Sequence, residues 1–153
     1  MNGTYAAVKF SDRCVADIVA IQESLNLAYP VSPDKLHSTV VYSKGKEIPF
    51  VPLSVEKILA TKAWLEVFNT HDSNVLVLRF DSEYLQSRHD YGSILGATYD
   101  FDEYLPHITL SYDVGAVTYG GEYDVVIEMN REYTEGIKKP LTEALLNEKR
   151  IYV

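Results

Sequence analysis

Two histidine–threonine pairs with matching surroundings are the residues of this chain best suited to chemistry. His37 and Thr39 lie in the run LHSTVVY at residues 36–42, and His107 and Thr109 lie in the run PHITLSY at residues 106–112. Histidine accepts or donates a proton near neutral pH, because its reference pKa is about 6.5. Threonine hydroxyls can hydrogen-bond phosphate oxygens. The two pairs therefore predict acid–base chemistry at a phosphate.

The two pairs belong to an internal duplication. The histidines are 70 positions apart, and each lies 27 positions after the Phe of an apolar–basic–Phe triplet, at residues 8–10 or 78–80. One His-x-Thr arises easily by chance, whereas two copies at equal offsets from similar triplets indicate a repeated unit. Each half of the chain then contributes one histidine and one hydroxyl to a site between the halves.

Strand periodicity places each histidine on the same face as its threonine. Side chains two positions apart on a strand share a face, so His37 points with Thr39 and His107 with Thr109. Regular alternation puts the remaining residues on the opposite face, namely Ser38, Val40 and Tyr42 in the first copy and Ile108, Leu110 and Tyr112 in the second. The second of these sets is typical of a core, so we expect the histidines to face away from the helices.

In-line displacement at phosphorus needs a base for the incoming hydroxyl and an acid for the departing oxygen, on opposite sides. Two imidazoles from two halves supply both groups, and in this scheme either histidine can be the base. The threonines hold the non-bridging oxygens between them. No metal and no cofactor is required. A zinc site at His37 and His107 is the weaker interpretation, because no third ligand stands at a recognisable spacing.

The elements that must position these residues follow from hydrophobic periodicity. Strands are expected at residues 4–10, 37–42, 55–68, 75–80, 107–112 and 123–129, helices at 11–27, 82–97 and 137–148, and a final segment at 151–153. No linker divides the 153 residues. We therefore expect one α+β domain of two pseudo-symmetric lobes, about residues 1–70 and 71–153. Each lobe has antiparallel sheet with helices on the outer face, and the active cleft lies between the lobes.

Composition narrows the choice of partner and compartment. The chain has 22 acidic and 14 basic residues and a net charge of −8. Proteins that bind long DNA or RNA present a basic surface, so a small nucleotide is the expected ligand. No apolar run approaches the roughly 20 residues that span a bilayer, and no secretory signal is visible. The single cysteine, Cys14, fits a reducing cytosol. These features predict a cytoplasmic protein that does not bind membranes.

The duplicated motif resembles the 2H phosphoesterase superfamily, which has one His-x-Thr/Ser motif in each of two pseudo-symmetric lobes. Its members include 2′-5′ RNA ligases and 2′,3′-cyclic phosphodiesterases. The opening residues 4–10, the run at 36–43 and the late residues 132–135 look most like a phage branch of it. This branch, the anti-CBASS nucleases, destroys the cyclic di- and trinucleotide signals of bacterial immunity. The resemblance implies a phage enzyme that acts in the cytosol of its bacterial host.

The resemblance implies His37 and His107 as the acid–base pair, with Thr39 and Thr109 as phosphate binders. It also implies a metal-independent reaction. A ribose 2′-hydroxyl attacks the adjacent 3′-5′ phosphodiester and gives a 2′,3′-cyclic phosphate, which water can open to a 3′-phosphate.

Four further residues are candidates to bind the substrate. Tyr5 and Trp64 resemble the base-stacking aromatics of the branch, and Glu135 resembles its base-contacting acid. The residue pattern supports two of these assignments, because Trp64 shares a polar strand face and Tyr5 lies on the face of Lys9. Lys9, with its repeat partner Arg79, is a candidate to offset phosphate charge.

Two other functions stay open at this point. One is an RNA-end enzyme of the same superfamily, which opens 2′,3′-cyclic phosphates or handles 2′-5′ linkages. The acidic charge disfavours it, since a tRNA-sized substrate benefits from a basic surface. The other is a non-catalytic sponge that sequesters cyclic nucleotides, which has no need of an acid–base pair.

Overall fold

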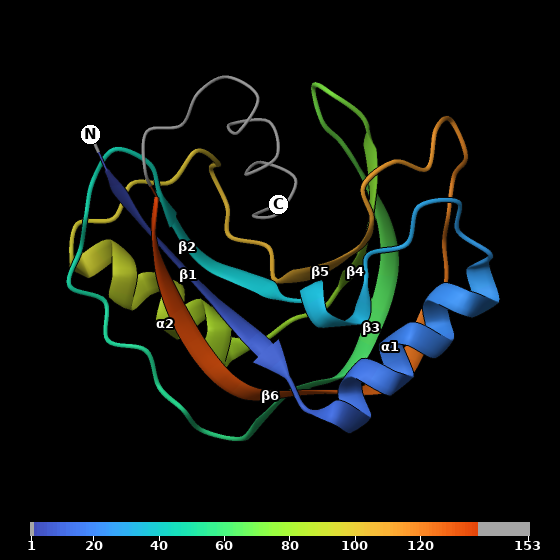
Figure 1. Ribbon diagram of the computed structural model, residues 1–153, viewed down its shortest axis with the longest axis horizontal. Coiled ribbons are helices and arrows are strands. Elements are labelled where there is room, and N and C mark those ends of the chain that lie inside the picture. Colours follow the sequence, from blue (N-terminus) through green and yellow to red (C-terminus); the bar gives the residue numbers. More distant parts are fainter. Residues whose placement is uncertain (1, 138–153) are drawn as a thin grey trace.

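One six-stranded antiparallel sheet forms the centre of the computed structural model, which describes residues 2–137 (Figure 1). The strand order is β2-β1-β6-β3-β4-β5. The strands are β1 (Gly3–Phe10), β2 (Ser38–Ser43), β3 (Lys57–Asn69), β4 (Asn74–Arg79), β5 (His107–Ser111) and β6 (Glu122–Ile137). The helices are α1 (Asp12–Leu25) and α2 (Glu83–Ile94), with a short 3₁₀ turn, η1 (Pro33–Lys35). The α+β class expected from the sequence is confirmed.

The sheet consists of two matching halves that meet at β6 and β3. In one half β1 pairs with the first motif strand, β2, and in the other β4 pairs with the second motif strand, β5. Both motif strands are therefore edge strands. The two edges nevertheless contact each other, so the sheet curls until its margins meet (Figure 1). The curl brings the two motifs to the inner face of one sheet.

Both helices pack on the outer face of the sheet. Ser11 and Ser82 cap them, each accepting a hydrogen bond from the backbone N–H three residues on, as N-cap residues do. Their apolar side chains join the alternate residues of β1 in one core, which includes Ala6, Val8, Phe10, Cys14, Ile18, Ile21 and Leu85. The opposite face of β1 contributes Tyr5 and Ala7 to a separate small cluster. The alternation of β1 thus separates Tyr5 from the core residues Ala6, Val8 and Phe10.

A β-bulge interrupts each motif strand directly after its threonine. Ala6 pairs with Val41 and Ala7 with Thr39, so Val40 is the extra residue in β2. In β5 the pairing passes from Thr109 to Ser111 in the same way, so Leu110 is the extra residue. Both extra residues are buried in the core under the helices.

The bulges overturn one expectation from the sequence. Tyr42 and Tyr112 were expected on the face opposite the histidines. An extra residue in a strand reverses the alternation beyond it, and the two tyrosines therefore lie on the histidine side. Tyr42 packs against Tyr5, and Tyr112 lines a pocket together with His107.

Strand β6 is longer than its expected range of 123–129, because its second half pairs with β1 as far as Ile137. Of the expected helix at 137–148 only Ile137 is described, and it ends β6. The rest of that helix and the segment at 151–153 lie outside the described residues. Within residues 2–137, both α1 and α2 fall short of the length and apolarity that a bilayer-spanning helix needs.

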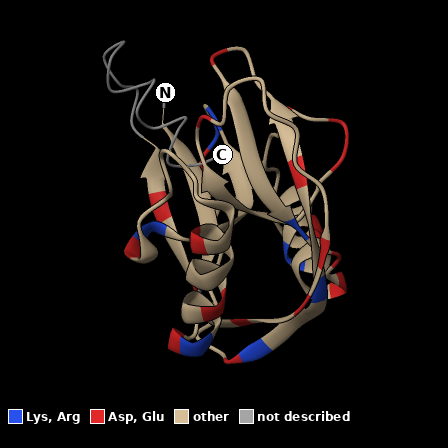
Figure 2. Ribbon diagram, turned by 90° about the vertical axis from the view of Figure 1, so that its right-hand side faces the viewer, with Lys and Arg blue, Asp and Glu red and all other residues tan. Residues whose placement is uncertain are grey.

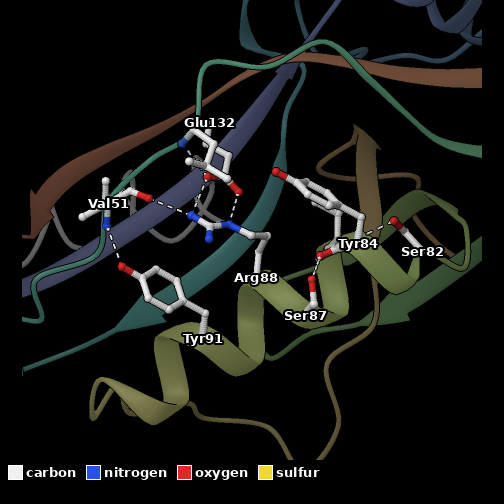
Figure 3. Close-up of polar contacts among 9 residues, drawn as sticks. Val51, Ser82, Tyr84, Ser87, Arg88, Tyr91 and Glu132 are labelled. Carbon is white, nitrogen blue, oxygen red and sulfur yellow. Dashed lines mark hydrogen bonds and ion pairs between the residues drawn. The ribbon is translucent and has the colours of Figure 1, made fainter.

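A buried ion pair ties α2 to β6 (Figure 3). Arg88 donates to the two carboxylate oxygens of Glu132 from Nε at 2.8 Å and from Nη2 at 2.9 Å. Nη2 also donates to the Val51 carbonyl, and the Leu53 N–H donates to Glu132. The carboxylate is fully buried, and the guanidinium lies over the ring of Tyr91. The pair therefore joins helix, sheet and the irregular connection before β3.

We expect Arg88→Met to lower the free energy of unfolding by about 3–5 kcal/mol, because it leaves a buried carboxylate without its partner. Urea unfolding followed by circular dichroism measures the change. The double variant Arg88→Met/Glu132→Gln should recover part of the loss. The exposed pair Lys62–Asp124 provides the control, since Lys62→Met should have no measurable effect. Equal effects of Arg88→Met and Lys62→Met would contradict this role.

Candidate active site

The inner face of the curled sheet brings residues from both motifs together. Thr39 and Tyr42 of β2 line one pocket of about 770 Å³ with His107 of β5. His37, the residue before β2, lines a second pocket of about 310 Å³. Thr109 follows His107 on β5, is paired with Val77 and is buried. Each histidine therefore lines a pocket, and Thr39 of the first motif shares the pocket of His107.

Each imidazole is held by an equivalent hydrogen bond to a backbone carbonyl. His37 Nδ1 lies 2.8 Å from the carbonyl oxygen of Lys35, and His107 Nδ1 lies 2.7 Å from that of Leu105. In both copies the carbonyl belongs to the residue two positions earlier. A carbonyl oxygen can only accept, so each Nδ1 carries a proton. This fixes the tautomer and leaves Nε2 of each ring as the atom for proton transfer.

The environment of His107 favours its neutral form. Burial lowers the pKa of His107 to about 4, and the charges of His37 and Arg79 act in the same direction. The hydrogen bond to Leu105 and the charge of Glu66 oppose the shift. At neutral pH His107 is therefore uncharged, which is the form that accepts a proton. Because His37 carries a like charge when protonated, we expect the two rings to titrate as a coupled pair.

Tyr5 lies beneath the first motif and contacts both of its residues. Its hydroxyl is 2.9 Å from Thr39 Oγ1, and its ring meets the ring of His37 edge-on at a centroid distance of 6.3 Å. The side chain has no exposed surface. In this conformation Tyr5 supports Thr39 and His37 and does not present a face for base stacking.

Lys9 and Glu135 both lie in the pocket of His37. The other residues that line it are Lys35, Arg131 and Tyr133. Lys9 donates to the Asp34 carbonyl at 2.8 Å, and burial and the charge of Arg131 lower the pKa of Lys9. Three cations and one carboxylate thus surround His37. This local excess of positive charge stands out in a chain of net charge −8, whose acidic residues are spread over helices, strands and loops (Figure 2).

Trp64 lies in the other half of the sheet, in a cross-strand row with His107. Trp64 of β3 pairs with Arg79 of β4, which pairs with His107 of β5. The Arg79 guanidinium is 5.1 Å from the centroid of the Trp64 ring and donates to both carboxylate oxygens of Glu66. Trp64 is partly exposed and lines neither of the two pockets. Arg79, the repeat partner of Lys9, is therefore neutralised by a carboxylate.

The residues that hold the bulge of β2 were not predicted from the sequence. His89 of α2 donates from Nδ1 to the Val40 carbonyl at 2.7 Å, and its ring stacks on Tyr104 at 4.3 Å. The Tyr104 hydroxyl donates to the Thr39 carbonyl at 2.7 Å. The place of Tyr42 and Tyr112 on the histidine side was also not predicted. The sequence carries only a weak sign that the two are equivalent, since each stands five positions after its histidine.

The described residues provide no further ligands for a metal at the two histidines. Within residues 2–137 no three His, Cys, Asp or Glu side chains lie together as a metal-binding group. Cys14 is buried in the core, and burial raises its pKa to about 11, so it stays a thiol, whereas metals bind the thiolate.

Comparisons with known proteins extend over nearly the whole chain. The family model described as anti-CBASS protein Acb1 matches residues 2–144. The anti-CBASS protein Acb1 of Enterobacteria phage T4 is 45% identical over 137 residues, with 90% of each chain covered. That of Salmonella phage S16 is 43% identical over 144 residues, with 94% of each covered. The crystal structure of TT0787 of Thermus thermophilus is similar in fold, with a TM-score of 0.61 at 15% identity over 93% of this chain and 90% of that one.

The coupling of the two rings can be measured without any substrate. We expect the ring nitrogens of His107 in ¹⁵N-labelled protein to titrate with a pKa of about 4. Replacement His37→Asn should raise this pKa, because it removes a like charge that disfavours the imidazolium. The nitrogen chemical shifts should also report the Nδ1–H tautomer above that pKa. Titration of His107 near 6.5 in both proteins would contradict the proposed geometry.

Proposed function

This chain belongs to the Acb1 family of anti-CBASS proteins, and we propose on that premise that it is a phosphodiesterase for cyclic di- and trinucleotides. It cleaves their 3′-5′ linkages in the cytosol of a bacterial host, so that a phage evades CBASS defence. The observation that carries the proposal is the pair of identically held imidazoles, each beside a threonine, on the inner face of one curled sheet. A protein that only sequesters the nucleotide has no use for two imidazoles with fixed tautomers.

The proposed chemistry starts from the neutral state of His107. His107 is neutral, and its Nε2 takes the proton of a ribose 2′-hydroxyl as that oxygen bonds to phosphorus. His37 gives a proton from Nε2 to the departing 5′-oxygen as the P–O5′ bond breaks. The products are a 2′,3′-cyclic phosphate and a 5′-hydroxyl, and water can open the cyclic phosphate with the two roles exchanged.

The backbone carbonyls and the threonines support both stages of this reaction. The carbonyls of Lys35 and Leu105 accept from the Nδ1–H of each ring, whether the ring is neutral or protonated. Thr39 and Thr109 hydrogen-bond the non-bridging oxygens, and Tyr5 keeps the Thr39 hydroxyl in place. No step requires a metal.

The remaining candidate substrate-binding residues form two groups, one on the His37 side and one on the His107 side. Lys9, with Lys35 and Arg131, neutralises a phosphate that is not cleaved, and Glu135 contacts a base in the same pocket. Trp64 offers its partly exposed ring to a base on the other half of the sheet. A second phosphate is present in every cyclic dinucleotide and absent from a 2′,3′-cyclic mononucleotide. A cationic pocket beside His37 therefore favours a cyclic oligonucleotide over a 2′,3′-cyclic mononucleotide.

We expect cleavage of 3′-5′ cyclic dinucleotides to proceed in EDTA, with products resolved by chromatography. His37→Ala and His107→Ala should each abolish turnover and leave much of the binding, because each removes one proton-transfer group. A substrate with 2′-deoxyribose at the cleaved linkage should resist, because it lacks the attacking hydroxyl. Full activity in both variants, or loss of activity in EDTA, would contradict the proposed mechanism. Tight binding without turnover by the wild type would instead identify a sponge.

The cationic pocket can be tested separately. Lys35→Gln and Arg131→Gln should each raise KM for a cyclic dinucleotide, on the order of fivefold, with little change in kcat. The effect should shrink at high salt, because ions screen exposed charges. Lys62→Gln is the matched control, an exposed lysine on β3 that lines neither pocket. Equal KM values for the three variants and the wild type would remove these cations from the binding site.

A further inference from the structure

The larger of the two pockets is lined by many aromatic side chains that have no part in the proposed acid–base chemistry. Thr39 and His107 form part of its wall, and its volume of about 770 Å³ is in the usual range of small-molecule sites, about 300–1,000 Å³. Six Phe and Tyr side chains line it, namely Tyr42, Phe68, Tyr99, Phe101, Tyr104 and Tyr112. Whatever occupies this pocket lies against rings on one side and against the reacting groups on another.

The loop between α2 and β5 forms one wall. Tyr99 and Phe101 meet edge-on at 5.5 Å, and Tyr99 also contacts the ring of His89 at 4.7 Å. Tyr104 anchors the loop to β2 through the Thr39 carbonyl, and Asp100 pairs with Lys44. The rings are thus held in place before a ligand arrives, which lowers the entropy cost of binding.

Phe101 is the ring most available to a ligand. It is 67% exposed, although large apolar side chains are usually covered. Across the pocket, Phe68 meets His107 at a centroid distance of 4.9 Å, and the bulges turn Tyr42 and Tyr112 towards the same space. Because His107 and Thr39 also line this pocket, a group bound in it lies beside the residues proposed to act on the phosphate.

We propose that this pocket binds one nucleobase of the substrate by stacking, with Phe101 as the main exposed face. This inference rests on the function proposed above and deepens it. A nucleobase is the flat, aromatic part of a nucleotide, and its faces stack on any Phe or Tyr ring without regard to base identity. The two pockets then orient the substrate, with one base on the His107 side and, on the cationic His37 side, the uncleaved phosphate and the base that Glu135 contacts.

The probe for the test is a cyclic dinucleotide in which 2-aminopurine replaces one base and both riboses are 2′-deoxy, so that it is bound but not cleaved. Stacking on Phe101 should quench its fluorescence in the wild type. Phe101→Ala should raise the Kd about 5- to 150-fold, which corresponds to the usual 1–3 kcal/mol of one base–aromatic stack. Phe101→Tyr should restore both the affinity and the quenching.

Tyr29→Ala is the matched control, because Tyr29 is 68% exposed and lines neither pocket, and it should behave as the wild type. If the wild type binds the probe and Phe101→Ala binds it equally well, the base lies elsewhere and this inference is wrong while the proposed function stands. If the wild type does not bind the probe, the proposed function and this inference fail together.

Discussion

The curl of a single antiparallel sheet is the constraint on which the site depends. The two motif strands are the outermost of six, and in a flat sheet five interstrand spacings would separate them by about 24 Å. Instead the edges contact each other, and the charge of His37 adds to the effect of burial in lowering the pKa of His107. Sheet twist and β-bulges are the usual sources of such curvature. Register shifts occur in the β1–β2, β1–β6, β3–β6 and β4–β5 pairings.

The bulges also decide what each motif presents to the inner face. Without them, each strand would present its histidine and threonine there and turn the following tyrosine into the core. With them, Val40 and Leu110 fill the core while Tyr42 and Tyr112 join the histidine side. Near the first bulge the Thr39 and Val40 carbonyls receive hydrogen bonds from Tyr104 and His89. The loop and α2 thereby fix the strand at the point where its threonine must be placed.

Patterns within short stretches of the sequence predicted those parts of the structure that interactions between neighbouring residues determine. The two helices, the face of Tyr5 on β1 and the strands at the two motifs are each set by neighbouring residues, and they were predicted. The bulges were not, because apolar Val40 and Val41 fit either face until the pairing with β1 selects one. The second half of β6 was missed because Glu132 is polar, and its burial depends on Arg88 from a distant helix. The burial of Tyr5 and the aromatic pocket likewise arise from long-range packing.

The two halves of the repeat share their geometry but differ in charge. This difference makes the two ends of the cleft chemically distinct. Beside His107 the cation Arg79 is neutralised by Glu66 and covered by Trp64, and the adjoining pocket is aromatic. Beside His37 three cations and one carboxylate line a common pocket. Salt screens exposed charges beyond about 8–10 Å, so a small nucleotide inside the cleft responds mainly to these near cations. A long polyanion lying over the surface also meets the distributed acidic residues (Figure 2). The same charge distribution that admits a small cyclic nucleotide therefore disfavours long nucleic acid.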